Sequence, residues 1–336
     1  MNNVDYYSKT CSKIGFWMLI FYASFTLSAF FVAIVELAFS KVISDFSSEI
    51  IFGLLSAICY FLSFSVAAFF LRRSCRELPN SRSIYTSFKF NKWTVFIVLA
   101  VIAVNFSVSY LNNSFFTSLF PRISSNLMPS SVSDLAGRKM SELVVLFLIE
   151  ILSTAIVPAI CEEYLFRGAI LTDLLPFGKS TAIFASAFLF GMMHQNPMQI
   201  LYTTLMGVII GYVYVKTRSI WVCMILHFCN NFITVLEEYL PVFTKATWLI
   251  YVLDLLVVAV GAVSILLLLL HKSKEHDPQK DGSFGVVGER GMDVEEMTLE
   301  LSSKEKIKRF FAVTVIIYTA ISIFSMLKIL VSFMVI

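Results

Sequence analysis

Charge is scarce in this sequence of 336 residues. Asp, Glu, Lys and Arg make up 15% of it, whereas soluble domains carry about 25%. Hydrophobic residues make up 58%, and Phe alone occurs 33 times. This balance excludes an ordinary soluble domain and predicts a membrane protein. The formal net charge of +3 is small and gives no indication of a nucleic-acid partner.

Several patterns are missing, and each absence counts against a class of protein or site. None of the six cysteines forms a CxxC pair, so neither a disulfide framework nor a thiolate metal site is supported. There is no HExxH zinc motif and no internal repeat of the kind that transporters often carry. No cleavable signal peptide is expected, because the first apolar run is too long for one and lacks a small-residue cleavage pattern.

Long hydrophobic runs dominate what is present. A hydrocarbon core of about 30 Å needs about 20 apolar residues per helix. Nine segments approach this length: 14–39, 50–71, 93–111, 143–166, 181–194, 198–215, 220–236, 247–270 and 310–336. The fifth is short and the sixth follows it closely, so eight spans are the alternative count. The sequence predicts an all-α, polytopic bundle of transmembrane helices.

Basic residues predict the orientation. With the N-terminus inside, the cytoplasmic segments hold 19 of the 26 Lys and Arg residues, and the external loops hold five. This asymmetry follows the positive-inside rule. Compact loops and the lack of a targeting extension favour the bacterial cytoplasmic membrane.

Three regions are expected along the chain. Residues 1–140 form an N-terminal trio of helices with an external loop at 112–141. Residues 141–240 hold most of the polar residues that fall within apolar runs. Residues 241–336 supply two further spans around a polar cytoplasmic segment, 271–309, which we expect to be partly disordered, with a surface helix before the last span.

The polar residues of 141–240 form a constellation: Glu162, Glu163, Arg167, His194, His227, Asn230 and Asn231. Charges are costly inside a membrane, so they predict function or a structural ion pair. Glu163 and Arg167 are four residues apart and can pair on one helix face. Glu162 is rotated by about 100° from Glu163 and is left free to take and give protons.

Two further side chains suit the same chemistry. His227 and Asn231 are also four apart, so two donors project from one face, as an oxyanion hole requires. His194, on another helix, can orient the same water as Glu162. The plainer alternatives are a structural Glu–Arg pair and histidines that only pack, and the Gly207–Gly211 stripe is interpreted as helix packing.

These residues carry a resemblance. "EEYLFRG" matches the pattern EExxxR, "FGMMH" matches FxxxH and "HFCNN" matches HxxxN, in this order and about 32 residues apart. The set resembles the CPBP family of intramembrane proteases, which includes the type II CAAX prenyl endopeptidases and the bacterial Abi proteins linked to bacteriocin immunity. Family members frequently have Gly where Arg218 stands.

The resemblance implies hydrolysis of a peptide bond at or within the bilayer. It makes Glu162 the water-activating base, His194 its partner, and His227 and Asn231 the oxyanion donors, with Glu163 and Arg167 in support. We expect no required cofactor. The metalloprotease alternative is a zinc ion held by Glu162, His194 and His227.

The expected substrate is a membrane-associated peptide or protein within the lipid bilayer. Neither its identity nor the oligomeric state follows from the sequence. A non-catalytic immunity or scaffold protein and a transporter are the alternatives from other classes.

Overall fold

The computed structural model describes residues 3–39, 45–76, 83–86, 92–119, 135, 137–274 and 301–334. Over these residues the secondary structure is helical, apart from one isolated β-bridge between Thr86 and Ser219. The elements are α1 (Asn3–Phe39), α2 (Asp45–Arg76), α3 (Lys92–Leu119), α6 (Met140–Glu150), η1 (Ile151–Ile156), α7 (Val157–Glu163), η2 (Tyr164–Leu171), α8 (Thr172–Leu174), η3 (Leu175–Phe177), α9 (Lys179–Met193), α10 (Ile200–Thr217), α11 (Ile220–Thr244), α12 (Trp248–Lys274), α13 (Ser303–Phe310) and α14 (Val313–Met334).

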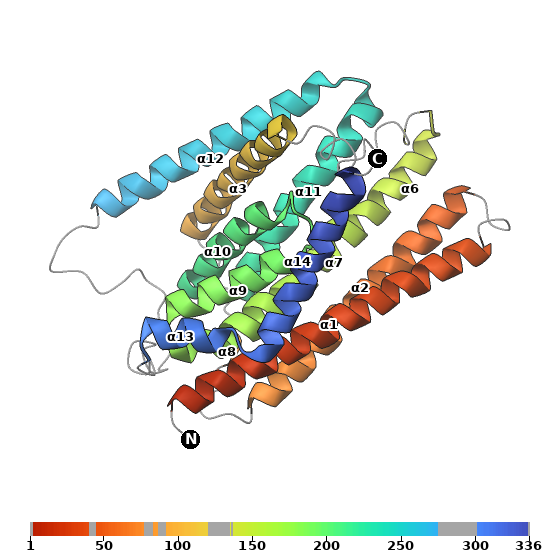
Figure 1. Ribbon diagram of the computed structural model, residues 1–336. Helices are drawn as coiled ribbons and strands as arrows, with labels where there is room; N and C mark the ends of the chain where they lie inside the picture. Colours follow the sequence, from red (N-terminus) through yellow and green to blue (C-terminus); the bar gives the residue numbers. More distant parts are fainter. Residues whose placement is uncertain are drawn as a thin grey trace.

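The helices run roughly along one axis, as an all-α membrane bundle requires (Figure 1). The pair α1 and α2 forms one flank, with α14 beside α1, and the pair α3 and α12 forms the opposite flank. The stretch from α6 to α11 lies between the two flanks. Eight of the described helical stretches are long and apolar enough to cross a membrane, which confirms the predicted fold class.

The expected span at 181–194 is wrong. Helix α9 has 15 residues and is therefore about 22 Å long, less than the hydrocarbon core of about 30 Å. It begins after Gly178, whose φ of 111° breaks the preceding helix, and it is followed by Gln195 in the left-handed region. Helix α10 then runs back beside α9 (Figure 1). The two form a hairpin whose first arm is a partial span.

Other boundaries also differ from the expected ones. Helix α1 starts at Asn3, well before the expected start at 14. Its first turns precede the apolar run and are held by packing of Tyr6 and Tyr7 against the Phe177 ring. The expected surface helix before the last span is α13, capped by the Ser302 hydroxyl, which accepts from the Glu305 amide at 3.2 Å. Most of the expected external loop (120–134 and 136) and most of the polar segment 271–309 (275–300) lie outside the described residues.

Two ion pairs join the N-terminal helices to later segments. The buried Arg72 of α2 donates to Asp173 of α8, and the partly exposed Arg138 guanidinium donates to both carboxylate oxygens of Glu49, at 2.5 and 2.7 Å. The hydrogen bonds that Arg138 donates to Glu49 raise the pKa of Arg138 above its usual value. The pair between Arg72 and Asp173 fixes α2 against α8, at the end of the bundle where the N-terminus lies.

Two details of α10 follow from its neighbours. A Cβ added at Gly207 would lie 3.0 Å from Ala187 of α9, and one at Gly211 would lie 3.2 Å from Leu171. This close approach confirms that the glycine stripe is a packing face. Arg218 ends the helix with φ 50° and ψ 38°, a left-handed conformation that favours glycine, which accounts for the glycine frequent in the resembling family.

Candidate active site

The two adjacent acids lie between two π-helical segments, η1 and η2. π-Segments within α-helices often mark functional sites. Pro158 explains part of the irregularity, because it has no N–H to donate to the Thr154 carbonyl four residues earlier. The carbonyls of η2 are also supported by side chains: the Ser186 hydroxyl donates to the Phe166 carbonyl, and the Thr172 hydroxyl donates to the Arg167 carbonyl, each at 2.8 Å.

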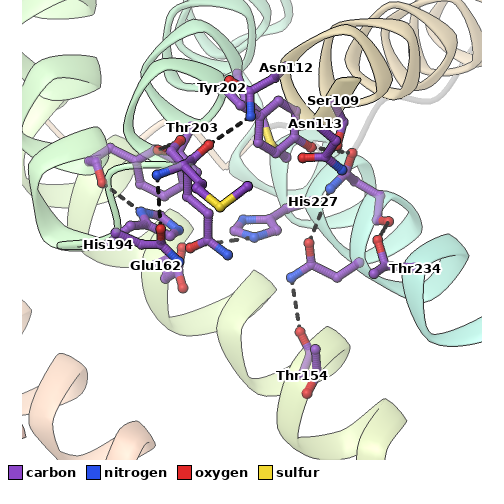
Figure 2. Close-up of a pocket in the computed structure, with 17 residues that line it drawn as sticks. Ser109, Asn112, Asn113, Thr154, Glu162, His194, Tyr202, Thr203, His227 and Thr234 are labelled. Atoms are coloured by element: carbon purple, nitrogen blue, oxygen red, sulfur yellow. Dashed lines mark hydrogen bonds and ion pairs between the residues drawn. The ribbon is translucent and has the colours of Figure 1, made fainter. Parts of the chain in front are cut away.

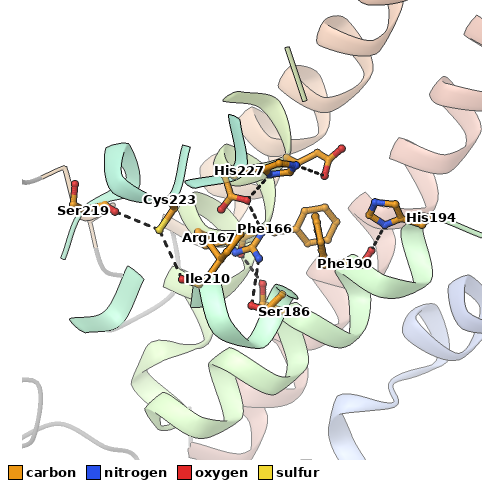
Figure 3. A network of polar contacts seen from close by, with 12 residues as sticks. Phe166, Arg167, Ser186, Phe190, His194, Ile210, Ser219, Cys223 and His227 are labelled. Carbon is orange, nitrogen blue, oxygen red and sulfur yellow. Dashed lines mark hydrogen bonds and ion pairs between the residues drawn. The ribbon is translucent and has the colours of Figure 1, made fainter. Parts of the chain in front are cut away.

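Glu163 is the centre of a buried ion pair. Its Oε1 accepts from Nη1 of Arg167 at 2.9 Å, as the spacing predicts, and also from Nδ1 of His227 at 2.8 Å. Glu163 is 0% and Arg167 1% exposed. The guanidinium also donates to the Gly207 carbonyl at 3.3 Å and lies over the Phe190 ring, with its Cζ 4.7 Å from the ring centroid. Figure 3 shows Arg167 enclosed among these groups.

Glu162 points away from this pair, as the predicted rotation requires. Its Oε1 accepts a hydrogen bond from the Tyr60 hydroxyl of α2. Its Oε2 lies 3.9 Å from Nε2 of His227 and has no hydrogen-bond partner among the described residues. A separation of 3.9 Å is too long for a direct hydrogen bond. One carboxylate oxygen is therefore held in place, and the other faces the imidazole.

His194 occupies the end of α9. Its Nδ1 lies 2.9 Å from the Phe190 carbonyl, which can only accept, so Nδ1 carries the proton and donates. The neutral ring then presents Nε2 as an acceptor. The short α9 and the start of the turn after it therefore fix both the position and the tautomer of this histidine.

Asn231 is held by a chain of hydrogen bonds. Its Nδ2 donates to the Thr154 carbonyl at 2.9 Å, the same carbonyl that Pro158 leaves without an α-helical partner. Its Oδ1 accepts from Asn230 at 3.2 Å, and Asn230 in turn accepts from the Tyr202 hydroxyl at 3.0 Å. Figure 2 shows the link to Thr154 below the histidines. One N–H of the Asn231 amide remains for another partner.

The four predicted catalytic side chains share one cavity of about 320 Å³. Glu162, His194, His227 and Asn231 all line it, so the structure brings together residues from three separate helical segments. Glu163 and Arg167 do not line it and lie behind His227. Ser109, Asn112 and Asn113 of α3 also line the cavity. A neighbouring cavity of about 240 Å³ extends between α3, α11 and α12 and is lined by Glu237 and Asp254.

Three parts of this site were not predicted from the sequence. Tyr60 comes from a distant helix, and Tyr202 lies in an apolar run where a tyrosine is unremarkable. The Thr154 carbonyl does have a signal in the sequence, because Pro158 four residues later removes its usual donor.

The metalloprotease alternative assigns Glu162, His194 and His227 as ligands of a zinc ion. Among the residues that the structure describes, no group of three or more His, Cys, Asp or Glu side chains is arranged to hold one. Both histidines nevertheless donate from Nδ1 to an oxygen acceptor, a pattern also found around zinc ligands. The residues as they are placed do not converge on a metal position.

Comparison with known proteins gives the class of the central segment. Residues 144–233 match the family described as Type II CAAX prenyl endopeptidase Rce1-like, which confirms the resemblance predicted from the three motifs. A relative from Bacillus subtilis (strain 168), named "Putative membrane peptidase YdiL", is 33% identical over 95 residues. The aligned part is 27% of this chain and 38% of that protein, so the chain covers well under half of the relative. No solved structure matches the chain.

Proposed function

We propose that the chain is an intramembrane endopeptidase that hydrolyses a peptide bond with a water molecule activated by Glu162. The observation that carries this proposal is the position of Glu162 Oε2, which faces His227 Nε2 across 3.9 Å in a shared cavity. A water molecule placed to one side of these two atoms would be within hydrogen-bond reach of both at that separation. The match of residues 144–233 to a prenyl endopeptidase family supports the same reaction class.

The reaction begins at this water. Glu162 Oε2 takes a proton from the water, whose oxygen then bonds to the scissile carbonyl carbon. His194, with a free Nε2 acceptor, orients the water on the other side. When the tetrahedral intermediate collapses, the C–N bond breaks, and Glu162 returns the proton to the leaving nitrogen.

The negative oxygen of the intermediate requires donors. Asn231 supplies the N–H that is not bonded to Thr154. His227 donates from Nε2 when both ring nitrogens carry a proton, because Nδ1 is already bonded to Glu163. With His227 in this form, the two positive charges of Arg167 and His227 balance the two negative charges of the glutamates in the buried site.

The zinc alternative uses Glu162, His194 and His227 as ligands, and a bound zinc ion would polarise the carbonyl and activate the water. This assignment would remove Glu162 as the base. We favour the metal-free reaction and expect no required cofactor. A tightly bound, stoichiometric zinc whose removal abolishes cleavage would replace the mechanism but not the protease assignment.

The proposed substrate is a membrane-associated peptide or the tail of a membrane protein. The proposed location is the bacterial cytoplasmic membrane, with the N-terminus inside. A role in bacteriocin immunity belongs to the resembling family, and it fits cleavage of a membrane-active peptide as well as a non-catalytic scaffold.

The experiment that separates these functions uses purified full-length protein in lipid nanodiscs, mixed with membrane peptides of varied sequence. Mass spectrometry then identifies new peptide termini for the wild type, for Glu162→Ala, and for wild type with a strong chelator. The proposal expects new termini with the wild type, with or without chelator, and none with Glu162→Ala. Transport or binding without new termini would favour a transporter or a non-catalytic immunity protein.

A further inference from the structure

Tyr60 touches the proposed base from a helix outside the family match. Its hydroxyl donates to Oε1 of Glu162, 102 residues away in the sequence. Tyr60 lies in α2, whereas the matched segment is 144–233. In the described part of the chain, neither cavity has Tyr60 in its lining, so its phenol approaches the carboxylate from the side away from the cavity.

Other aromatic rings hold Tyr60 in place. Its ring stacks on Phe64 with the centroids 4.5 Å apart and 23° between the planes, and the edge of Phe25 meets it at 5.7 Å. Phe64 is 1% exposed and also packs against Phe21 of α1, at 4.4 Å. The direction of the hydroxyl is therefore fixed by packing between α1 and α2.

We propose that Tyr60 is a positioning residue for Glu162, an inference that rests on the proposed function. A carboxylate can rotate about its last bond, and either oxygen can then face the cavity. By occupying Oε1, the Tyr60 hydroxyl leaves Oε2 as the one oxygen beside His227 that can take a proton from water.

The chemistry of tyrosine suits this role. The phenol is neutral, so it bonds to the carboxylate without adding a charge to the buried site. The N-terminal pair of helices is then part of the catalytic unit, because it fixes the base that the matched segment carries.

The kinetic test is Tyr60→Phe, which keeps the ring packing and removes only the hydroxyl. Loss of a positioning contact should lower kcat on the order of 10- to 100-fold, with KM within about twofold of the wild type because Tyr60 does not line the cavity. Tyr214→Phe is the matched control: this buried hydroxyl bonds to Thr172 and the Tyr85 amide, away from Glu162. It should lower the unfolding temperature and leave kcat unchanged.

A second measurement does not depend on turnover. The shift in unfolding temperature caused by Tyr60→Phe is compared in the wild type and in Glu162→Leu, which has no acceptor. We expect the hydroxyl to stabilise the wild type and to contribute nothing, or to be unfavourable, in Glu162→Leu. Equal shifts in both backgrounds would contradict the contact.

The two measurements distinguish the possible failures. An unchanged kcat in Tyr60→Phe, with wild-type cleavage intact, would overturn the positioning role and leave the proposed function standing. Coupling between the two residues in a wild type that cleaves nothing would reject the proposed function and reduce Tyr60 to a structural contact.

Discussion

His227 and Glu163 lie 64 positions apart in the sequence, and a 2.8 Å hydrogen bond joins Nδ1 of the imidazole to Oε1 of the carboxylate. The same oxygen accepts from Arg167 at 2.9 Å. One buried acid therefore neutralises Arg167 and sets the orientation of His227. It connects the stability of the bundle to the geometry of the site.

Removal of the Glu163 charge should destabilise the protein. Glu163→Gln leaves Arg167, 1% exposed, without its counter-charge, and breaking a buried ion pair in this way costs about 3–5 kcal/mol. The free energy of unfolding in mixed micelles measures the loss. Glu49→Gln is the control: it breaks the exposed pair with Arg138 and should cost no more than about 1 kcal/mol. Equal losses in the two variants would contradict the account of the buried pair.

Asn231→Ala should reduce turnover and leave the fold intact. Loss of one oxyanion donor typically lowers kcat by about 100- to 1000-fold, with little change in KM. Asn105→Ala removes an asparagine of α3 that is 1% exposed and lines neither cavity in the described structure, and it should leave kcat unchanged. A loss of kcat below about tenfold in Asn231→Ala would exclude this side chain as an oxyanion donor.

Pro158→Ala should change stability and activity in opposite directions. The new N–H can bond to the Thr154 carbonyl, which removes a helix defect worth up to about 3 kcal/mol. The same bond competes with Asn231 for that carbonyl, so we expect kcat to fall by about tenfold. Pro241→Ala, at a proline inside α11 and away from the cavity, should raise stability and leave kcat unchanged. Parallel behaviour of the two variants would contradict the link between Pro158 and Asn231.

The proposed orientation can be tested with reporter fusions. Fusions after Glu77 and Arg290 should read as cytoplasmic, and fusions after Ser125 and Thr244 as external, because basic residues concentrate in the segments assigned to the inside. The start of α1 and the end of α12 lie at the same end of the bundle (Figure 1). An external reading at Arg290 would mean that the number of crossings is wrong.

The local part of this site could be predicted from the sequence, because helical spacing alone relates residues four apart. The pairing of Glu163 with Arg167 and the separate direction of Glu162 follow from that spacing and are confirmed. The length of α9 could not be predicted, since apolar composition does not show that a turn at Gln195 ends the helix early.

The long-range contacts were beyond the sequence for a different reason. In a membrane helix nearly every face is apolar, so periodicity does not show that Tyr60 faces the bundle or which helix it meets. The same holds for the bond between His227 and Glu163, which depends on how α11 packs against α7.

The central claim is that the Glu162 carboxylate activates water, and the turnover of Glu162→Gln tests it most directly. Glutamine keeps the shape and can still accept the Tyr60 hydrogen bond, but it does not take a proton from water. With the unfolding temperature matched to the wild type and the same substrate, we predict that kcat falls by at least about 100-fold, the scale of general base catalysis. A kcat within about tenfold of the wild type in the folded variant would contradict the mechanism.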